Sequence, residues 1–191
     1  MTGPAPAATS PTRHARGMQL TDGRVRLRAP VPSDVDALVE SVSRSLPELE
    51  PWMPWATRDY DRSVGMKWIT GELDAKAHSF VIVDTDGTFA GTCGLNGIDE
   101  LNRSANLGYW LDSGRTGRGL ATAATKLLAV HALRRLDLHR VEIVMAVGNV
   151  ASRRVAERAG ATYEGRLRNR LLLHGVHHDA HSFSMIPSDL P

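Results

Sequence analysis

The stretch Arg115–Thr122, read RTGRGLAT, places two glycines on either side of an arginine and directly before an alanine-rich apolar run. A strand followed by a short glycine turn and a helix start presents unpaired backbone N–H groups at the positive end of a helix dipole. Such an arrangement binds anions, phosphate above all. Gly117 and Gly119 permit positive φ and put no Cβ between a phosphate and these amides. The motif predicts either a phosphate site or only a tight turn between a strand and a helix.

Two common phosphate loops are excluded by the same residues. No Gly-Lys-Ser/Thr follows the glycines, as a P-loop requires. The stretch also lacks the third glycine and the acidic residue about 20 positions later that mark a dinucleotide-binding βαβ unit. A phosphate held here would therefore belong to another class of ligand.

Asn149 and Ser152 form a second group of polar residues, at the end of an expected strand and the start of an expected helix. Both residue types are preferred at helix N-caps, so capping alone explains them. Their side chains are also polar groups that can contact a ligand at the end of that strand. Both interpretations remain open and are compatible.

A histidine-rich segment near the C-terminus, HGVHHDAH, raises the question of a metal site. His177, Asp179 and His181 would share one face of a strand. The chain has no second cluster of ligands elsewhere, and zinc sites usually draw on two. We expect no metal.

The elements that must position these residues follow from hydrophobic periodicity and from turn residues. The chain is expected to fold as one α/β domain with a mixed sheet flanked by helices. Strands are expected at about 24–30, 80–83, 88–95, 105–112, 140–147, 161–168 and 179–186, and helices at about 33–45, 61–77, 119–136 and 149–160. Ser33 and Asp36 form a capping-box pattern for the first helix.

Segment 46–57, LPELEPWMPWAT, carries three prolines and two tryptophans, so we expect an aromatic-lined elbow of short turns there. Residues 1–17 contain almost no bulky apolar side chain and are expected to form a flexible tail, with the domain spanning 18–191. A single cysteine, Cys93, allows no internal disulfide. A net charge of +2 gives no case for nucleic-acid binding, and no apolar run approaches the roughly 18 residues of a membrane helix. A cytoplasmic protein is expected.

Two longer segments carry a resemblance to a known family: ANLGYWLDSGRTGRGLATAATKLL and, later, NVASRRVAERAGATYEGRLR. They resemble the GNAT superfamily of N-acetyltransferases, within it the group similar to bacterial enzymes that acetylate ribosomal protein N-termini. The resemblance covers about residues 22–187 and implies a splayed mixed sheet. The superfamily's loop signature, Gln/Arg-x-x-Gly-x-Gly/Ala, falls on 116–121, where Thr116 departs at the first position and Arg115 lies one place early.

The resemblance implies acetyl-CoA as acyl donor and assigns roles to residues of the loop and the neighbouring strands. Loop residues expected to hold the coenzyme A pyrophosphate are Gly117, Arg118, Gly119, Leu120, Ala121 and Thr122. Trp110 and Leu111 would pair with the pantetheine arm through their backbone, while core packing is the alternative for the Trp110 side chain. Asn149 would contact pantetheine, and Ser152 would donate a proton to the sulfur in place of the superfamily's usual tyrosine.

The general base and the acceptor site are less fully specified by the resemblance. Asn106 stands where superfamily members often have a glutamate, and Leu171 where ribosomal-type relatives suggest another carboxylate. Glu100 and Asp99 are the nearest candidates, with solvent exposure or proton loss through ordered water as alternatives. Trp52 and Trp55 would line the substrate side.

These observations predict an acetyl-CoA-dependent N-acetyltransferase that acts by direct attack of a primary amine, expected to be a protein N-terminal α-amine. Two alternatives remain: acetylation of a small, antibiotic-like amine, and a non-catalytic acyl-CoA-binding sensor. Acetyl-CoA and the amine are the expected partners, and a homodimer is left open.

Overall fold

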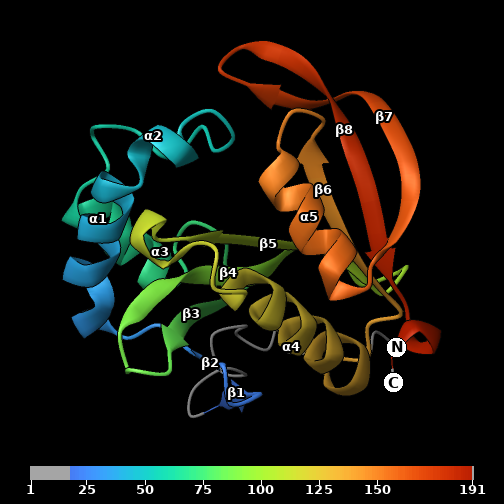
Figure 1. Cartoon of the computed structure of the whole chain (residues 1–191), viewed down its shortest axis with the longest axis horizontal. Coiled ribbons are helices and arrows are strands. Elements are labelled where there is room, and N and C mark those ends of the chain that lie inside the picture. The colour runs from blue at the N-terminus through green and yellow to red at the C-terminus, as the bar shows by residue number, and fades with distance from the viewer. Residues whose placement is uncertain (1–17, 191) are drawn as a thin grey trace, which may run out of the picture.

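The computed structural model describes residues 18–190, which form one α/β domain around an eight-stranded mixed sheet (Figure 1). The strand order across the sheet is β1-β2-β3-β4-β5-β6-β8-β7. The strands are β1 (Gln19–Thr21), β2 (Val25–Arg28), β3 (His78–Asp84), β4 (Phe89–Asp99), β5 (Ser104–Leu111), β6 (Arg140–Ala146), β7 (Thr162–Leu173) and β8 (Val176–Met185). The tail expected at residues 1–17 lies outside the described residues.

The helices cover both faces of this sheet. They are α1 (Val35–Arg44), α2 (Leu46–Leu49), α3 (Arg62–Thr70), α4 (Leu120–Arg135) and α5 (Val150–Ala159). Helix α4 packs against strands β1 to β6 and against α5 in the larger apolar core, while α1 and α3 form a second core with Trp110. Within residues 18–190, no helix is both long and apolar enough to cross a membrane.

The central strands β5 and β6 run parallel, whereas every other neighbouring pair in the sheet is antiparallel. Their pairing covers only Ser104–Asn106 opposite Arg140–Glu142. Beyond Asn106 the two strands diverge, so β5 loses its neighbour on that side from Leu107 onward. The splay expected from the resemblance is confirmed.

Strand alternation sends neighbouring β5 residues to opposite faces of the sheet. Leu107 is buried in the core that contains α4, and Trp110 in the core that contains α1 and α3. Tyr109 follows Leu107 and contacts the first of these cores. The strand therefore carries side chains to both sides of the splay.

The expected first helix is confirmed, but its cap is formed differently. A 3-10 turn (Pro32–Asp34) precedes α1, and the Asp34 carboxylate accepts the Val31 N–H at 2.8 Å. Arg28 pairs with the same carboxylate. The Ser33–Asp36 capping box is wrong, because the N-cap residue of α1 is Asp34, whose carboxylate bonds to Val31 and Arg28 and to no amide of α1. Asp36 pairs with Arg62.

The second expected helix is shorter than predicted. Asp61 caps α3 by accepting the Val64 N–H at 2.9 Å. Gly71, at φ +80°, then ends the helix after Thr70, well before Ala77. A left-handed glycine is a common helix stop and outweighs the apolar spacing that suggested a longer helix.

Candidate active site

The glycine loop begins where β5 ends and leads directly into α4. Gly117 and Gly119 both adopt left-handed backbone conformations, with φ of +75° and +77°. Gly119 is the N-cap of α4 and makes no side-chain cap, and the first helical bond runs from the Ala123 N–H to the Gly119 carbonyl. The amides of Leu120, Ala121 and Thr122 therefore have no partner within the helix.

The space in front of these amides is open. An added Cβ on Gly117 or Gly119 would meet no heavy atom of the described chain within 4 Å. The glycines are thus required for backbone conformation, and their missing side chains leave room at the amides. A pyrophosphate fits this combination of free N–H groups, positive dipole end and open space.

Two arginines of the loop are held by Asp84, at the end of β3, and Asp86, in the β3–β4 turn. Arg115 pairs with Asp84 at 3.0 Å and with Asp86 at 2.7 Å, and Arg118 pairs with Asp84 at 2.6 Å. Burial would raise the pKa of Asp84, but the Thr85 amide and both arginines outweigh it, so the pKa lies below its ordinary value. The ion pairs anchor the loop to the sheet, and the Arg118 side chain remains about half exposed.

The start of the loop is clamped from the other direction by α1. Asp112 is buried and accepts hydrogen bonds from Ser41 Oγ at 2.6 Å, Arg44 at 2.9 Å and the Gly114 N–H at 2.8 Å. Burial opposes ionisation of Asp112, but these donors prevail and its pKa is lowered. The Ser45 hydroxyl accepts the Ser113 N–H at 2.8 Å. The loop is therefore fixed at both ends before any ligand binds.

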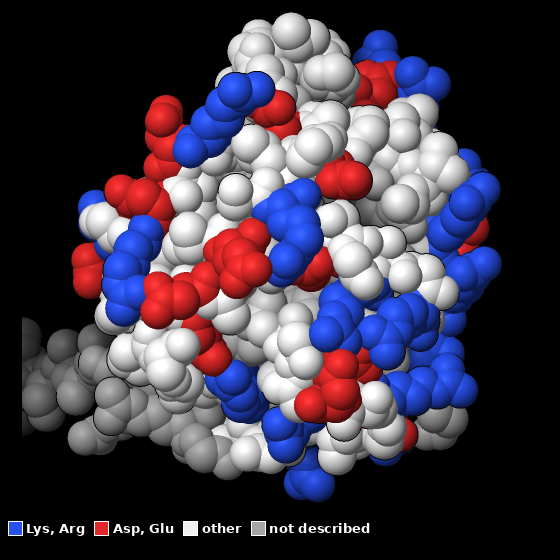
Figure 2. Space-filling model, turned by 60° about the vertical axis from the view of Figure 1, so that its left-hand side comes forward, with Lys and Arg blue, Asp and Glu red and all other residues white. Residues whose placement is uncertain are grey.

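These ion pairs are part of a mixed surface. Figure 2 shows acidic and basic side chains interspersed over the face on which α1 lies.

Trp110 and Leu111 lie in the part of β5 that has no β6 neighbour. The edge of β5 on the side of β6 is unpaired here, so an extended ligand can pair with it. The Trp110 side chain is buried against Phe89 and Trp55, so core packing and backbone availability coexist.

Across the gap, Asn149 and Ser152 begin α5 as expected. The Asn149 side-chain oxygen accepts the Ser152 N–H at 3.0 Å, which confirms the capping interpretation. The Tyr109 hydroxyl donates to the Ser152 carbonyl oxygen at 3.0 Å, and Ser152 Oγ lies 3.0 Å from the same hydroxyl. A phenol has one proton, so Ser152 is the donor in the second bond.

Tyr109 is the residue that the sequence analysis missed on this side. Burial raises the pKa of Tyr109 to about 12, although its bond to Ser152 works against that shift. The phenol therefore stays protonated at neutral pH. The alternation of GYWL could have identified it, since Tyr109 must face away from Trp110.

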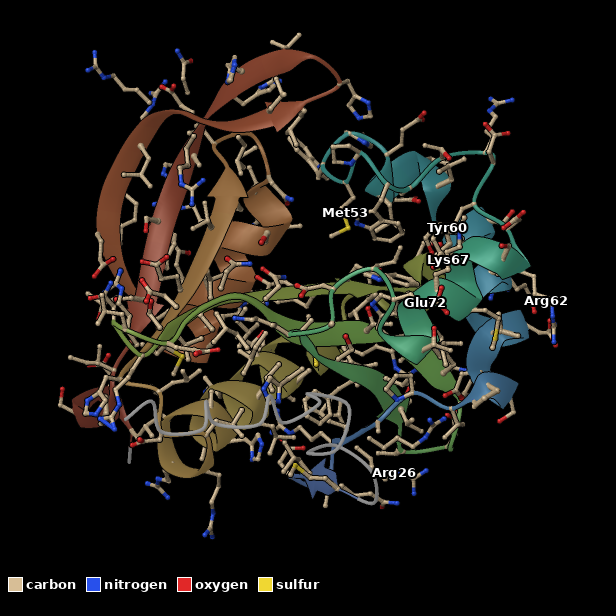
Figure 3. All side chains as sticks on the ribbon, turned by 180° about the vertical axis from the view of Figure 1, so that it is seen from behind. Arg26, Met53, Tyr60, Arg62, Lys67 and Glu72 are labelled. Atoms are coloured by element: carbon tan, nitrogen blue, oxygen red, sulfur yellow. The ribbon has the colours of Figure 1, made fainter. Side chains whose placement is uncertain are left out.

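A cavity of about 540 Å³ lies under the loop between α2 and α3, and both Tyr109 and Trp110 of β5 line it. Its floor includes residues of β3, β4 and β5, and its walls come from the α2–α3 loop, α3 and the α3–β3 connection. Figure 3 shows Met53 and Tyr60 between this loop and the sheet, with Arg62 on the outer side of α3. The lining residues used below are Met53, Trp55, Tyr60, Trp68, Asp74, Ser79, Thr92, Gly94, Asn96, Gly108 and Trp110.

The two tryptophans expected on the substrate side have different places. Trp55 lines the cavity and is 42% exposed. Trp52 lies outside it and packs on the β6–α5 connection, where an added Cβ on Gly148 would be 3.1 Å from its ring. Trp52 therefore borders the Asn149 end of the gap rather than the cavity.

The candidate bases lie away from this cavity. Glu100 is exposed and pairs with Lys76 at 3.2 Å, and Asp99 accepts hydrogen bonds from the backbone and side chain of Asn102. Neither residue lines the cavity. Asn106 donates to Asn96 Oδ1 at 3.0 Å, so an amide pair occupies the position where a strand glutamate was considered.

Comparisons with known proteins agree with this geometry. A family model described as "Acetyltransferase (GNAT) domain" matches residues 24–162. The "Putative ribosomal N-acetyltransferase YdaF" of Bacillus subtilis (strain 168) is 32% identical over 167 residues, which cover 85% of this chain and 91% of that protein.

Two solved structures share the fold at similar identity. The ribosomal L7/L12 alpha-N-protein acetyltransferase RimL, in complex with coenzyme A, is 29% identical with a TM-score of 0.78, covering 85% of this chain and 94% of that one. Mycobacterium smegmatis RimJ, in complex with CoA-disulfide, is 30% identical with a TM-score of 0.78, covering 91% and 88%.

Proposed function

The chain belongs to the GNAT family of N-acetyltransferases, and from this premise we propose that it moves the acetyl group of acetyl-CoA directly to a primary amine, the N-terminal α-amine of a protein. The observation that carries the proposal is the unpaired segment of β5. Gly108 and Trp110 lie along the splay and also line the cavity. A donor in the splay and an acceptor in the cavity would therefore meet at one strand.

Donor binding is supported by the loop and by the strand edge. The amides of Gly117 to Thr122 would hold the pyrophosphate, and the backbone of Trp110 and Leu111 would pair with the pantetheine arm. Asn149 uses its side-chain oxygen for the helix cap, which leaves its Nδ2 hydrogens to donate to a pantetheine carbonyl. The similarity to RimL and RimJ, both solved with coenzyme A ligands, supports this assignment.

Transfer requires a neutral amine at the thioester carbonyl and a proton for the departing thiolate. In the proposed reaction the amine nitrogen forms a bond to the acetyl carbon, the carbon–sulfur bond breaks, and the sulfur is protonated. Ser152 would relay that proton: its hydroxyl turns from Tyr109, passes a proton to the sulfur and regains one from water. The amine would lose its own proton to water over the cavity floor, because Glu100 and Asp99 do not line the cavity.

Direct attack is favoured over a covalent acyl-enzyme on cysteine. Cys93 is buried in β4, and burial raises the pKa of its thiol well above the ordinary value. A buried neutral thiol is a poor nucleophile.

The experiment that tests the proposal is thiol release from acetyl-CoA across peptides with free N-termini and small primary amines, with mass spectrometry locating the acetyl group. We expect release with peptide substrates and an added acetyl on the α-amine. The small-amine alternative is favoured by the cavity volume of about 540 Å³, which lies within the usual range for small-ligand sites. Turnover of small amines alone would select that alternative, and coenzyme A binding without any turnover would select the sensor.

A further inference from the structure

The cavity under the α2–α3 loop has an unusual set of walls for a site that must accept an amine. Five of its lining residues are aromatic: Trp55, Tyr60, Trp68, Tyr109 and Trp110. Among residues 18–190, Asp74 is its single carboxylate, and no lysine, arginine or histidine lines it. The charged lining is thus entirely negative.

The aromatic rings form a connected wall. The centroids of Trp55 and Tyr60 lie 5.6 Å apart, and those of Trp55 and Trp110 lie 6.0 Å apart. Trp55 keeps 42% of its surface exposed although it sits among these rings. An ammonium ion is attracted to the face of such rings, most strongly to tryptophan, when it comes within about 6 Å of the centroid.

Two polar groups complement this wall. Burial raises the pKa of Tyr60 to about 12, so its hydroxyl stays neutral, and the described chain offers that hydroxyl no hydrogen bond. Asp74 lies at the exposed rim, where its Oδ1 accepts the Lys76 backbone N–H at 3.0 Å. The Lys76 ammonium pairs with Glu100, so it does not neutralise Asp74.

The floor is polar but carries no charge. Ser79, Thr92 and Asn96 line it, and Gly94 stands directly opposite Gly108 in the β4–β5 ladder. An acceptor with a carboxylate beside its amine would find no cationic partner here. Placing an unpaired carboxylate among aromatic rings is unfavourable.

We infer that this cavity binds the acceptor as a protonated primary amine that carries an apolar or aromatic group and no adjacent carboxylate. The inference rests on the proposed function and deepens it, because it names the class of acceptor. A protein N-terminus satisfies the rule, since its α-carboxyl is an amide. A free amino acid violates it.

The test compares four probes that share one phenyl group: 2-phenylethylamine, phenylalaninamide, phenylalanine and 2-phenylethanol. Binding to the coenzyme A-loaded protein is followed by quenching of tryptophan fluorescence, which needs no turnover. We expect the amine and the amide to bind at least about tenfold more tightly than phenylalanine or the alcohol, the size of one modest charge interaction. Equal affinity of phenylalanine and phenylalaninamide would overturn the inference.

Two charge-removing variants distinguish a specific contribution of Asp74 to amine binding from a general effect of losing one negative charge. Asp74→Asn should weaken binding of 2-phenylethylamine by about tenfold and leave binding of 2-phenylethanol unchanged. Glu72→Gln is the matched control, because Glu72 is an exposed acid two positions away that does not line the cavity. Trp55→Leu should weaken the amine more than the alcohol.

Asp74-dependent amine binding without thiol release would support the inference while contradicting the proposed transfer. Thiol release that is indifferent to Asp74→Asn, Trp55→Leu and an adjacent carboxylate would support the transfer while overturning the inference.

Discussion

Ser152 and Tyr109 are the two side chains on which the proposed proton delivery depends. Ser152→Ala should lower kcat by about 10²-fold, the lower end of the range for losing one general acid, with little change in coenzyme A affinity. Tyr109→Phe should lower kcat less, because it removes only the bond that positions Ser152. Steady-state kinetics with calorimetric coenzyme A titrations would measure both.

The double variant gives the sharper result. If Tyr109 acts through Ser152, Tyr109→Phe should add almost nothing once Ser152 is alanine. Strictly additive losses would contradict the positioning role, and a Ser152→Ala enzyme with the wild-type rate would remove Ser152 from the mechanism.

Because His131 is buried, the free energy of unfolding should depend on pH, independently of catalysis. Its side chain is buried in α4 beside Phe80, and Nε2 has no partner in the described chain. Burial, with smaller contributions from His78 and Arg135, lowers its pKa below 6.5. The unfolded chain therefore binds more protons than the native protein as pH falls below 6.5, and stability decreases through that window.

His131→Leu should flatten this pH dependence. Urea unfolding at about pH 7.5 and about pH 5.5 would show a smaller loss of unfolding free energy in the variant than in the wild type. Identical losses would assign the effect to other groups. Acidic residues such as Asp84 and Asp112, whose pKa values are lowered, lose their contribution only at lower pH, as it falls below about 4.

At the scale of elements, two glycines at helix ends, one inside the glycine loop and one outside it, allow a controlled test of the loop. Gly119 and Gly160 both adopt left-handed conformations at helix ends, and an added Cβ meets nothing within 4 Å at either. Gly119→Leu and Gly160→Leu should therefore cost similar stability, about 1–2 kcal/mol. Only Gly119→Leu should abolish the rise in Tm that coenzyme A binding causes. If coenzyme A still raised the Tm of this variant, the assignment of the loop as the pyrophosphate site would be wrong.

The clamp between α1 and the loop predicts a second contrast. Asp112→Asn disturbs a buried acceptor of three groups and should cost about 1–3 kcal/mol while weakening coenzyme A binding. Asp36→Asn, in an exposed pair with Arg62, should cost less than about 1 kcal/mol and leave binding intact. Equal effects in thermal unfolding and coenzyme A titration would show that the clamp does not position the loop.

Local patterns predicted most of these elements, and long-range contacts explain what they missed. The glycine loop, α4 and the capped start of α5 were readable from turn residues and periodicity, and all are confirmed. Strand β1 was missed because three residues carry no periodic signal. The roles of Tyr60, Trp68 and Asp74 were not predictable, because the cavity exists only when α3 and its flanking loops pack over the sheet.

At the scale of the whole molecule, the sheet divides into two parts that hold the gap between them. Strands β6, β8 and β7 form one part of the sheet and diverge from the other part at β5. The β7–β8 hairpin bends toward α2 (Figure 1). His174 at its tip lies 2.7 Å from the Glu50 carbonyl oxygen. This contact and the Trp52–Gly148 packing join the two parts across the splay.

A donor bound in the splay should react with an amine bound in the cavity, and peptide acetylation measures this reaction. Thiol release from acetyl-CoA is followed with two peptides of identical sequence, one with a free α-amine and one already N-acetylated. We expect thiol release with the free peptide alone, one acetyl group added at its α-amine, and no release by the Gly119→Leu enzyme. Saturable coenzyme A binding with no thiol release above the enzyme-free rate for either peptide or any primary amine would contradict this expectation.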